Sequence, residues 1–416
     1  MNPTSSLELN RRSVVASLLG GAFVSYAPLG FATAAAGADA IRPFRISVPQ
    51  KALDDLRRRL AATRWPDPEV VADGSQGLQQ ARLRALVDYW HTKYDWRKVE
   101  ARLNALPQFK TAIDGVDIHF LHIKSKHANA LPLLMTHGWP GSVVELLKVV
   151  GPLTDPTAYG GRAEDAFHLV LPSLPGYGFS GAPRTTGWGR HKVAEVWHQL
   201  MLRVGYPRYV AQGGDWGAVI TQAMGAQAPA GLMGIHINMP AVVPKNMPEK
   251  LSAKEQAAMD SLNAFFTKGV GYAQIQATRP QTLGYALADS PTGQAAWIYD
   301  KFVAWTDSGG NPESVLTRDD MLDDITLYWL TNTATSSARF YWENADLAFF
   351  AVDIDIPVGV TVFPGEIYRA PRSWAERCYR KLVYWNETDK GGHFAAFEQP
   401  ELFSKEVRAA FATLRS

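Results

Sequence analysis

The sequence predicts an α/β protein in which a mostly parallel sheet is covered by helices on both faces. Three observations lead to this prediction. Short apolar runs recur from about residue 107 onward, and strands buried on both faces of a parallel sheet have this composition. Helical patterns lie between the runs, in the alternation that builds such sheets. Strand signals are absent between about residues 241 and 345, so we expect a helical insertion there.

Residues 1–40 have the features of an export signal. Arg11 and Arg12 precede an uncharged stretch from Ser13 to Ala38, and the small-x-small pattern Ala38-Asp39-Ala40 ends it. Such segments are typical of a secretory signal, and the adjacent arginines indicate the twin-arginine route. We therefore predict a periplasmic or secreted protein without membrane attachment after signal removal. An uncleaved membrane anchor is the alternative, because the stretch exceeds the roughly 20 residues of a spanning helix.

Residues 41–106 are predicted to form an N-terminal helical extension. Two apolar stripes occur at spacings of three and four residues, one formed by Leu53, Leu56 and Leu60 and the other by Leu83, Leu86, Val87 and Trp90. A segment of this size buries little apolar surface by itself. We therefore expect the extension to pack against another part of the chain.

Residues 107–240 and 346–416 are predicted to be the two parts of the α/β core. Their candidate strands are the apolar runs Leu131–Met135, Phe167–Leu171, Tyr209–Ala211, Leu232–Ile237, Val358–Phe363 and Leu382–Trp385. Residues 241–345 between the two parts are rich in aromatic side chains at helical spacings. An aromatic helical insertion is expected to form a lid over the carboxyl ends of the strands and to enclose an apolar pocket.

The composition excludes several classes of function. The chain has 416 residues, of which 46% are hydrophobic and 20% charged, and its net charge is +2. This near-neutral balance, without a basic run, gives no field that would attract nucleic acid. Cys378 is the single cysteine, so an internal disulfide, a CxxC redox pair and a cysteine zinc cage are excluded.

Asp215 is the candidate nucleophile. It lies in Gly213-Gly214-Asp215-Trp216-Gly217, between the strand Tyr209–Ala211 and a helix predicted over residues 218–226. This is the pattern of a nucleophile elbow with Asp where Ser is usual. A helix N-cap is the alternative, but a cap does not require glycines on both sides. A carboxylate is suited to displacement at an sp³ carbon, which leaves an alkyl ester that water must hydrolyse.

A base and an orienting acid for that hydrolysis are found late in the chain. His393, in Gly391-Gly392-His393-Phe394, follows the last predicted strand and is the candidate base. Glu366 follows the strand Val358–Phe363, where the acid that orients the histidine is expected. Asp353 and Asp355 are rival carboxylates, but they precede that strand and would lie at the opposite end of the sheet.

An oxyanion hole is predicted beside the nucleophile. The loop His137-Gly138-Trp139-Pro140-Gly141-Ser142 follows the strand Leu131–Met135. It can direct the N–H of Trp139 toward the same space as the N–H of Trp216, and two such donors stabilise an oxyanion. Taken alone, the Pro-Gly pair would indicate only a turn.

With these motifs together, the chain resembles the epoxide hydrolases of the microsomal and juvenile-hormone type, which have the α/β-hydrolase fold. The resemblance extends from about Ile41 to the C-terminus. It rests on six motifs in order, Tyr94-Asp95-Trp96-Arg97, His137-Gly138-Trp139-Pro140-Gly141-Ser142, Pro175-Gly176-Tyr177-Gly178-Phe179-Ser180, Gly214-Asp215-Trp216-Gly217, Arg339-Phe340-Tyr341-Trp342-Glu343-Asn344 and Gly392-His393-Phe394-Ala395-Ala396-Phe397-Glu398. It implies hydrolysis of a small apolar epoxide to a vicinal diol, with water as co-substrate and without a metal or cofactor.

The resemblance also implies roles for single residues. Asp215 matches the family's nucleophile, His393 its base and Glu366 its acid. Tyr341 and Tyr272 match the lid tyrosines that hydrogen-bond the epoxide oxygen. A phenol can donate a hydrogen bond or a proton to the alkoxide that ring opening releases.

Three other functions are weighed against this one. A haloalkane dehalogenase would share the Asp215 nucleophile, but a halide leaves as a stable anion and needs no proton donor, so the tyrosines favour epoxides. A serine-type esterase would require Ser at the elbow. A scaffold used only for binding would be expected to lack a member of the triad. The sequence leaves homo-oligomerisation and the identity of the epoxide open.

Overall fold

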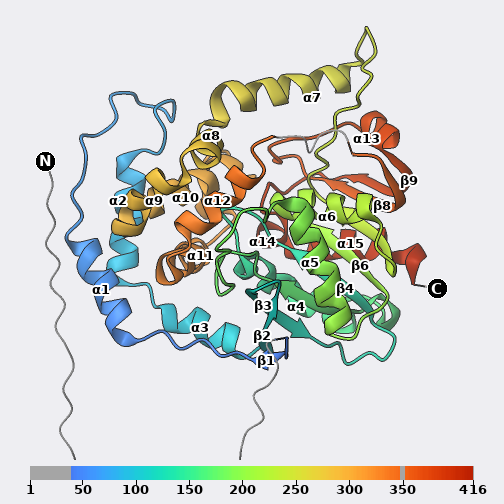
Figure 1. The fold of residues 1–416 in the computed structure, drawn as a ribbon. Helices are drawn as coiled ribbons and strands as arrows, with labels where there is room; N and C mark the ends of the chain where they lie inside the picture. Colours follow the sequence, from blue (N-terminus) through green and yellow to red (C-terminus); the bar gives the residue numbers. More distant parts are fainter. Residues whose placement is uncertain (1–38, 347–351, 416) are drawn as a thin grey trace, which may run out of the picture. The chain divides into compact units, whose positions relative to one another are not determined.

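The central sheet has nine strands and is mostly parallel, which confirms the predicted fold class (Figure 1). The computed structural model describes residues 39–346 and 352–415, so almost all of the predicted export signal lies outside the described residues. The strand order is β1-β2-β3-β5-β4-β6-β7-β8-β9. The six strands from β5 to β9 in this order pair in parallel, whereas β1, β2 and β3 form an antiparallel edge.

All six predicted strands are present in the sheet. They are β4 (Leu131–Thr136), β5 (Phe167–Pro172), β6 (Tyr209–Gly213), β7 (Leu232–Ile237), β8 (Ile354–Val362) and β9 (Tyr379–Glu387). The predicted start of β8 is wrong by four residues, because the first half of this strand is only partly buried and carries no continuous apolar run. Asp355 therefore lies inside β8, and Asp353 directly precedes it.

The antiparallel edge was not anticipated from the sequence. It consists of β1 (Arg42–Pro43), β2 (Gln108–Ile113) and β3 (Val116–Ile123). The extension, predicted to be wholly helical, thus contributes a short strand to the sheet. β1 has only two residues, and both are exposed. Neither the alternating pattern of a strand nor the spacing of a helix can be recognised in so short a segment.

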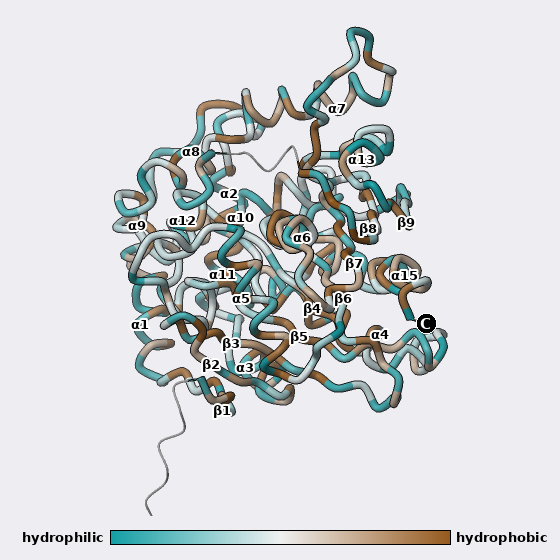
Figure 2. The backbone as a smooth tube through the Cα atoms, turned by 45° about the vertical axis from the view of Figure 1, so that its right-hand side comes forward, coloured by the Kyte–Doolittle hydropathy of each residue, from teal (hydrophilic) through white to brown (hydrophobic). Residues whose placement is uncertain are grey.

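Helices cover both faces of the sheet (Figure 2). On one face α5 (Arg190–Arg203) packs against α6 (Trp216–Gln227), and on the other α4 (Leu147–Thr154) packs against α15 (Pro400–Ala410). The strands between them are apolar along most of their length. The short helices α13 (Arg372–Cys378) and α14 (Ala395–Glu398) follow β8 and β9. Within the described residues, no helix is both long enough and apolar enough to cross a membrane.

The N-terminal extension packs against the lid. It contains α1 (Gln50–Ala61), α2 (Gln80–Thr92) and α3 (Trp96–Asn104), and the lid contains α7 (Ala253–Ala264), η4 (Phe265–Gly269), α8 (Gly271–Thr278), α9 (Pro280–Asp289), α10 (Pro291–Trp305), α11 (Arg318–Thr331) and α12 (Ala334–Glu343). The extension helices contact α10 and α11. Buried contacts join them, since the Tyr94 hydroxyl donates to Asp323 at 2.8 Å and Arg102 lies 2.8 Å from the same carboxylate. The extension therefore supports the lid from outside the sheet.

Candidate active site

Asp215 occupies the sharp turn between β6 and α6. Its φ of 52° and ψ of −128° form a backbone conformation that a non-glycine residue rarely adopts. The turn is tight enough that a Cβ at Gly217 would overlap the carbonyl oxygen of Thr136. Asp215 stands at the N-cap position of α6, but its side chain makes no capping hydrogen bond. The geometry is that of an elbow that projects the carboxylate away from its own helix.

Asp215, His393 and Glu366 form one chain of polar contacts. His393 Nε2 lies 3.2 Å from Asp215 Oδ2, and His393 Nδ1 lies 2.6 Å from Glu366 Oε1. The three residues follow β6, β9 and β8 respectively, and the carboxyl ends of parallel strands meet at one edge of the sheet. The arrangement has the order that a nucleophile, a base and an orienting acid require.

The two carboxylates favour a protonated His393. Burial by itself would lower the pKa of His393, but the charges of Glu366 and Asp215 and the hydrogen bonds with them raise it well above the ordinary histidine value. In contrast, burial lowers the pKa of His119 and His236 to about 3 and that of His137 to about 4. Those three imidazoles are therefore neutral at physiological pH.

The amide of Trp139 is bound to the nucleophile itself. Its N–H donates to Asp215 Oδ1 at 2.8 Å, and a Cβ at Gly138 would overlap the Asp215 carboxylate. When a nucleophile attacks the carboxyl carbon, the negative charge develops on such an oxygen. The structure thus places one of the two predicted oxyanion donors, and the role of the Trp216 N–H stays a prediction.

Tyr272 of α8 and Tyr341 of α12 face the nucleophile from the lid. The ring of Tyr272 stacks on Trp139 with 5.0 Å between centroids, and the ring of Tyr341 meets Trp216 edge-on at 4.8 Å. Burial, followed by the charge of Asp215, raises the pKa of Tyr272. Burial also raises the pKa of Tyr341, with smaller contributions from Tyr272 and Asp215. Both phenols therefore keep their protons.

The Tyr341 hydroxyl is buried, and the phenol of Tyr272 is close enough to interact with it by a hydrogen bond. A ligand oxygen placed beside this pair could accept a hydrogen bond from either phenol. Tyr341 lines an apolar cavity of about 260 Å³ together with Tyr272 and Asp215. Other lining residues come from the lid and from the segments after β7 and β8, and they include Leu262, Phe265, Phe266, Met239 and Ile367. This cavity can receive an apolar molecule with one polar group directed at the phenols.

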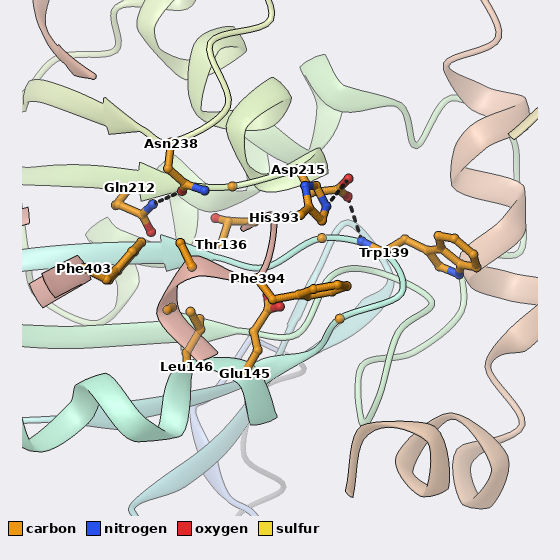
Figure 3. Close-up of a pocket in the computed structure, with 15 residues that line it drawn as sticks. Thr136, Trp139, Glu145, Leu146, Gln212, Asp215, Asn238, His393, Phe394 and Phe403 are labelled. Carbon is orange, nitrogen blue, oxygen red and sulfur yellow. Dashed lines mark hydrogen bonds and ion pairs between the residues drawn. The ribbon is translucent and has the colours of Figure 1, made fainter. Parts of the chain in front are cut away.

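A second cavity of about 30 Å³ lies on another side of Asp215 (Figure 3). Its lining combines apolar side chains, among them Leu146 and Phe403, with the polar side chains of Thr136, Glu145, Gln212, Asn238 and His393. The volume is sufficient for a water molecule, and the lining offers the polar partners that a buried water needs. The hydroxyl of Thr136 is buried without a hydrogen-bond partner among the described residues, which suits such a water.

Glu145 was missed in the sequence. It lies in the 3₁₀ helix η1 (Val143–Leu146), three residues after Ser142, and there it looks like an ordinary solvent-facing acid. In the fold its side chain faces the small cavity. Burial and the charge of Asp324 raise its pKa well above the ordinary value for Glu. Only its place directly after the Trp139 loop could have drawn attention to it.

The rival carboxylates lie away from this site. Asp353 pairs with Lys245 at 3.7 Å, and Asp355 pairs with Arg380 at 3.2 Å, at the amino end of β8. Both are exposed. Among the residues that the structure describes, no group of three or more His, Cys, Asp or Glu side chains is arranged to hold a metal ion.

Two family models match parts of the chain. Residues 41–146 match the family model for the epoxide hydrolase N terminus, and residues 132–273 match that for the alpha/beta hydrolase fold. A protein of Stigmatella aurantiaca is 60% identical over 377 residues, which cover 90% of this chain and 86% of that protein. Epoxide hydrolase 1 of Sus scrofa is 37% identical, with 91% and 90% covered. The crystal structure of juvenile hormone epoxide hydrolase from Bombyx mori superposes with a TM-score of 0.83 at 32% identity, covering 91% of this chain and 95% of that one.

Proposed function

The chain belongs to the epoxide hydrolase family of the α/β-hydrolase fold, and from this premise we propose that it hydrolyses small apolar epoxides through a covalent ester on Asp215. Hydrolysis of an epoxide to a diol is the family's general reaction. The observation that carries the covalent route is the position of Asp215, which has the two phenols on one side and His393 with Glu366 on another.

In the first step an oxygen of the Asp215 carboxylate attacks an epoxide carbon. A carbon–oxygen bond of the three-membered ring breaks as the ester bond forms. The epoxide oxygen takes up the charge and is stabilised by hydrogen bonds from Tyr272 and Tyr341, one of which supplies a proton. The position of both phenols in the lining of the cavity that Asp215 also lines supports this role.

In the second step water attacks the carboxyl carbon of Asp215. Ester formation removes the charge of Asp215, one of the two charges that hold His393 protonated, so the imidazole becomes a better base once the ester exists. The protonated His393 first returns a proton to the phenolate, which leaves a neutral imidazole. His393, oriented by Glu366, then takes a proton from a water held in the small cavity as the water oxygen bonds to the carboxyl carbon. The oxyanion forms at the Trp139 amide, with that of Trp216 as second donor. Its collapse breaks the ester bond, and the departing diol oxygen takes a proton from His393. The proton of the new carboxyl group then passes to His393, which restores the Asp215 carboxylate and the protonated imidazole.

We also propose that residues 1–40 direct export by the twin-arginine route, which would place the enzyme in the periplasm or outside the cell. The adjacent Arg11 and Arg12 and the small-residue exit at Ala38-Asp39-Ala40 support this proposal. N-terminal sequencing of the protein recovered from the periplasm or medium tests it. A start near Ile41 is expected, and an intact Met1 in the membrane fraction would favour the anchor instead.

A single turnover in oxygen-18 water tests the covalent route. The purified enzyme is mixed in excess with styrene oxide, and both the diol and the peptide that contains Asp215 are weighed. We expect the label in the Asp215 carboxylate and an unlabelled first-turnover diol, since the diol oxygen comes from the old carboxylate. Labelled diol with an unlabelled peptide would mean direct attack by water. Full activity of an Asp215→Ala variant would also refute the proposal.

A further inference from the structure

The loop that carries His393 is held through four consecutive backbone amides. The N–H of Gly391 donates to the carboxylate of Asp307 at 2.8 Å, and the N–H of His393 donates to the carbonyl of Trp305 at 2.9 Å. The amides on either side of His393, those of Gly392 and Phe394, both donate to Glu398. Four consecutive amides of one loop are therefore bound by acceptors from outside it.

Glu398 is the centre of this arrangement. Its Oε2 accepts from Gly392 N–H at 3.1 Å and from Asp307 N–H at 2.8 Å, and its Oε1 accepts from Phe394 N–H at 3.0 Å. The residue is 7% exposed. Hydrogen bonds to a buried carboxylate are stronger and more directional than those between neutral groups. This one side chain fixes the backbone before and after the base.

The same carboxylate joins the base to the lid. Asp307 and Trp305 belong to the end of α10 and the segment after it, about 90 residues before His393 in the chain. The Trp305 ring meets the rings of His393 and Tyr272 with centroid distances of 5.0 and 5.2 Å. A residue that only stabilised its own helix α14 would not need to reach Asp307, which lies in a different part of the molecule.

We propose that Glu398 is a positioning residue for the second half of the reaction. It fixes the imidazole of His393 between Glu366 and Asp215 and connects the His393 loop to the lid. The proposal rests on the covalent route above. In that route the attack of Asp215 on the epoxide needs no base, whereas hydrolysis of the ester requires His393. Loss of the Glu398 carboxylate should therefore slow the second step and leave the first nearly unchanged.

The test uses the full-length enzyme with Glu398→Gln, and Glu401→Gln as a matched control. Glu401 is an exposed acid in the first turn of α15, so its replacement changes the charge equally without touching the loop. Single turnovers with styrene oxide are quenched at intervals, and the intact protein is weighed to follow the alkyl-enzyme. For Glu398→Gln we expect alkylation within about 2-fold of the unmodified enzyme, hydrolysis slower by at least about 10-fold, and accumulation of the adduct. The Glu401→Gln variant should match the unmodified enzyme in both steps.

Three results would contradict the proposal. Equal slowing of both steps would indicate a general structural role, and unchanged rates would indicate no role. If Glu398→Gln does not fold, Glu398→Asp changes the same contacts while keeping the acid, and Asp307→Asn weakens the neighbouring contact with the Gly391 amide. A ratio of hydrolysis to alkylation that is unchanged in both variants would refute the coupling. Absence of any adduct in the unmodified enzyme and in the His393→Gln variant would instead refute the covalent route itself.

Discussion

The two cavities that meet at Asp215 differ in size and in chemistry. The larger, of about 260 Å³, is lined by apolar side chains of the lid and by the hydroxyls of Tyr272 and Tyr341. The smaller, of about 30 Å³, contains Glu145, His393 and the unpartnered Thr136 hydroxyl. Asp215 is the residue that both cavities share. One carboxylate thus faces a large apolar cavity on one side and a cavity of the size of a water molecule on another.

This difference explains how a single site can separate two steps. On the proposed route, the apolar cavity would exclude water from the epoxide until Asp215 has reacted, and the small cavity would keep a water beside His393. Each compartment should therefore control one half-reaction. The comparison leads to four predictions, given in order of decreasing effect. A substitution at the large cavity should change alkylation of Asp215 and leave ester hydrolysis intact, and a substitution at the small cavity should do the reverse.

Replacement of His393 by Gln should abolish the step on the small-cavity side. Without a base the ester cannot be hydrolysed at a useful rate, and we expect turnover to fall by about 10³-fold or more. The first turnover should still proceed, so that intact-protein mass spectrometry detects a stoichiometric adduct on Asp215. If adduct formation in this variant falls as much as turnover does, the assignment of one reaction step to each cavity is wrong.

Replacement of the phenols should affect the opposite side. The Tyr272→Phe and Tyr341→Phe variants each remove one donor to the epoxide oxygen, and the loss of both should slow alkylation by about 10²-fold or more. Each single variant should lose less, because the other phenol remains. Stopped-flow alkylation and the hydrolysis rate of the preformed ester are the measurements. Slower ester hydrolysis with normal alkylation would contradict the assignment of the two phenols to the alkylation step.

Replacement of Glu145 by Ala, which removes the hydrogen-bonding group of the side chain, should sharpen the comparison on the small-cavity side. If Glu145 holds the attacking water, the loss of one such hydrogen bond should slow ester hydrolysis by about 10-fold without changing alkylation. Thr221→Val provides a control, because the Thr221 hydroxyl is also buried without a partner in the described chain but faces neither cavity. An equal effect of both variants would argue against a water site at Glu145.

The smallest predicted effect concerns the thermal stability that protonated His393 contributes between Asp215 and Glu366. The pKa of His393 is raised in the folded protein, so protonated His393 stabilises the fold. This stabilisation is fully present below the unfolded histidine value of about 6.5 and is lost as the pH rises through the folded pKa. The difference in Tm between the unmodified enzyme and His393→Gln should therefore shrink as the pH is raised. A difference that grows with pH would contradict the raised pKa.

Much of the site could be predicted because its residues lie in local motifs. Asp215 stands between glycines that only a tight turn requires, and Glu366 and His393 each follow an apolar run that forms a strand. The pair Tyr272 and Tyr341 came from family resemblance, since nothing in composition or spacing separates them from other tyrosines. Glu145 and the contacts of Glu398 could not be predicted, because they depend on segments that only the tertiary fold brings together.

The sequence by itself determined the order of the parallel strands along the chain, the elbow, and the chemical type of the candidate nucleophile, base and acid. These are local properties, set by periodicity, turn chemistry and the identity of single side chains. The tertiary structure alone decided the antiparallel edge, the packing of the extension on the lid, and the separation of a large apolar cavity from a small one that contains polar groups. These features arise from contacts between residues distant in sequence, and their geometry is set by how helices and strands pack rather than by any one segment.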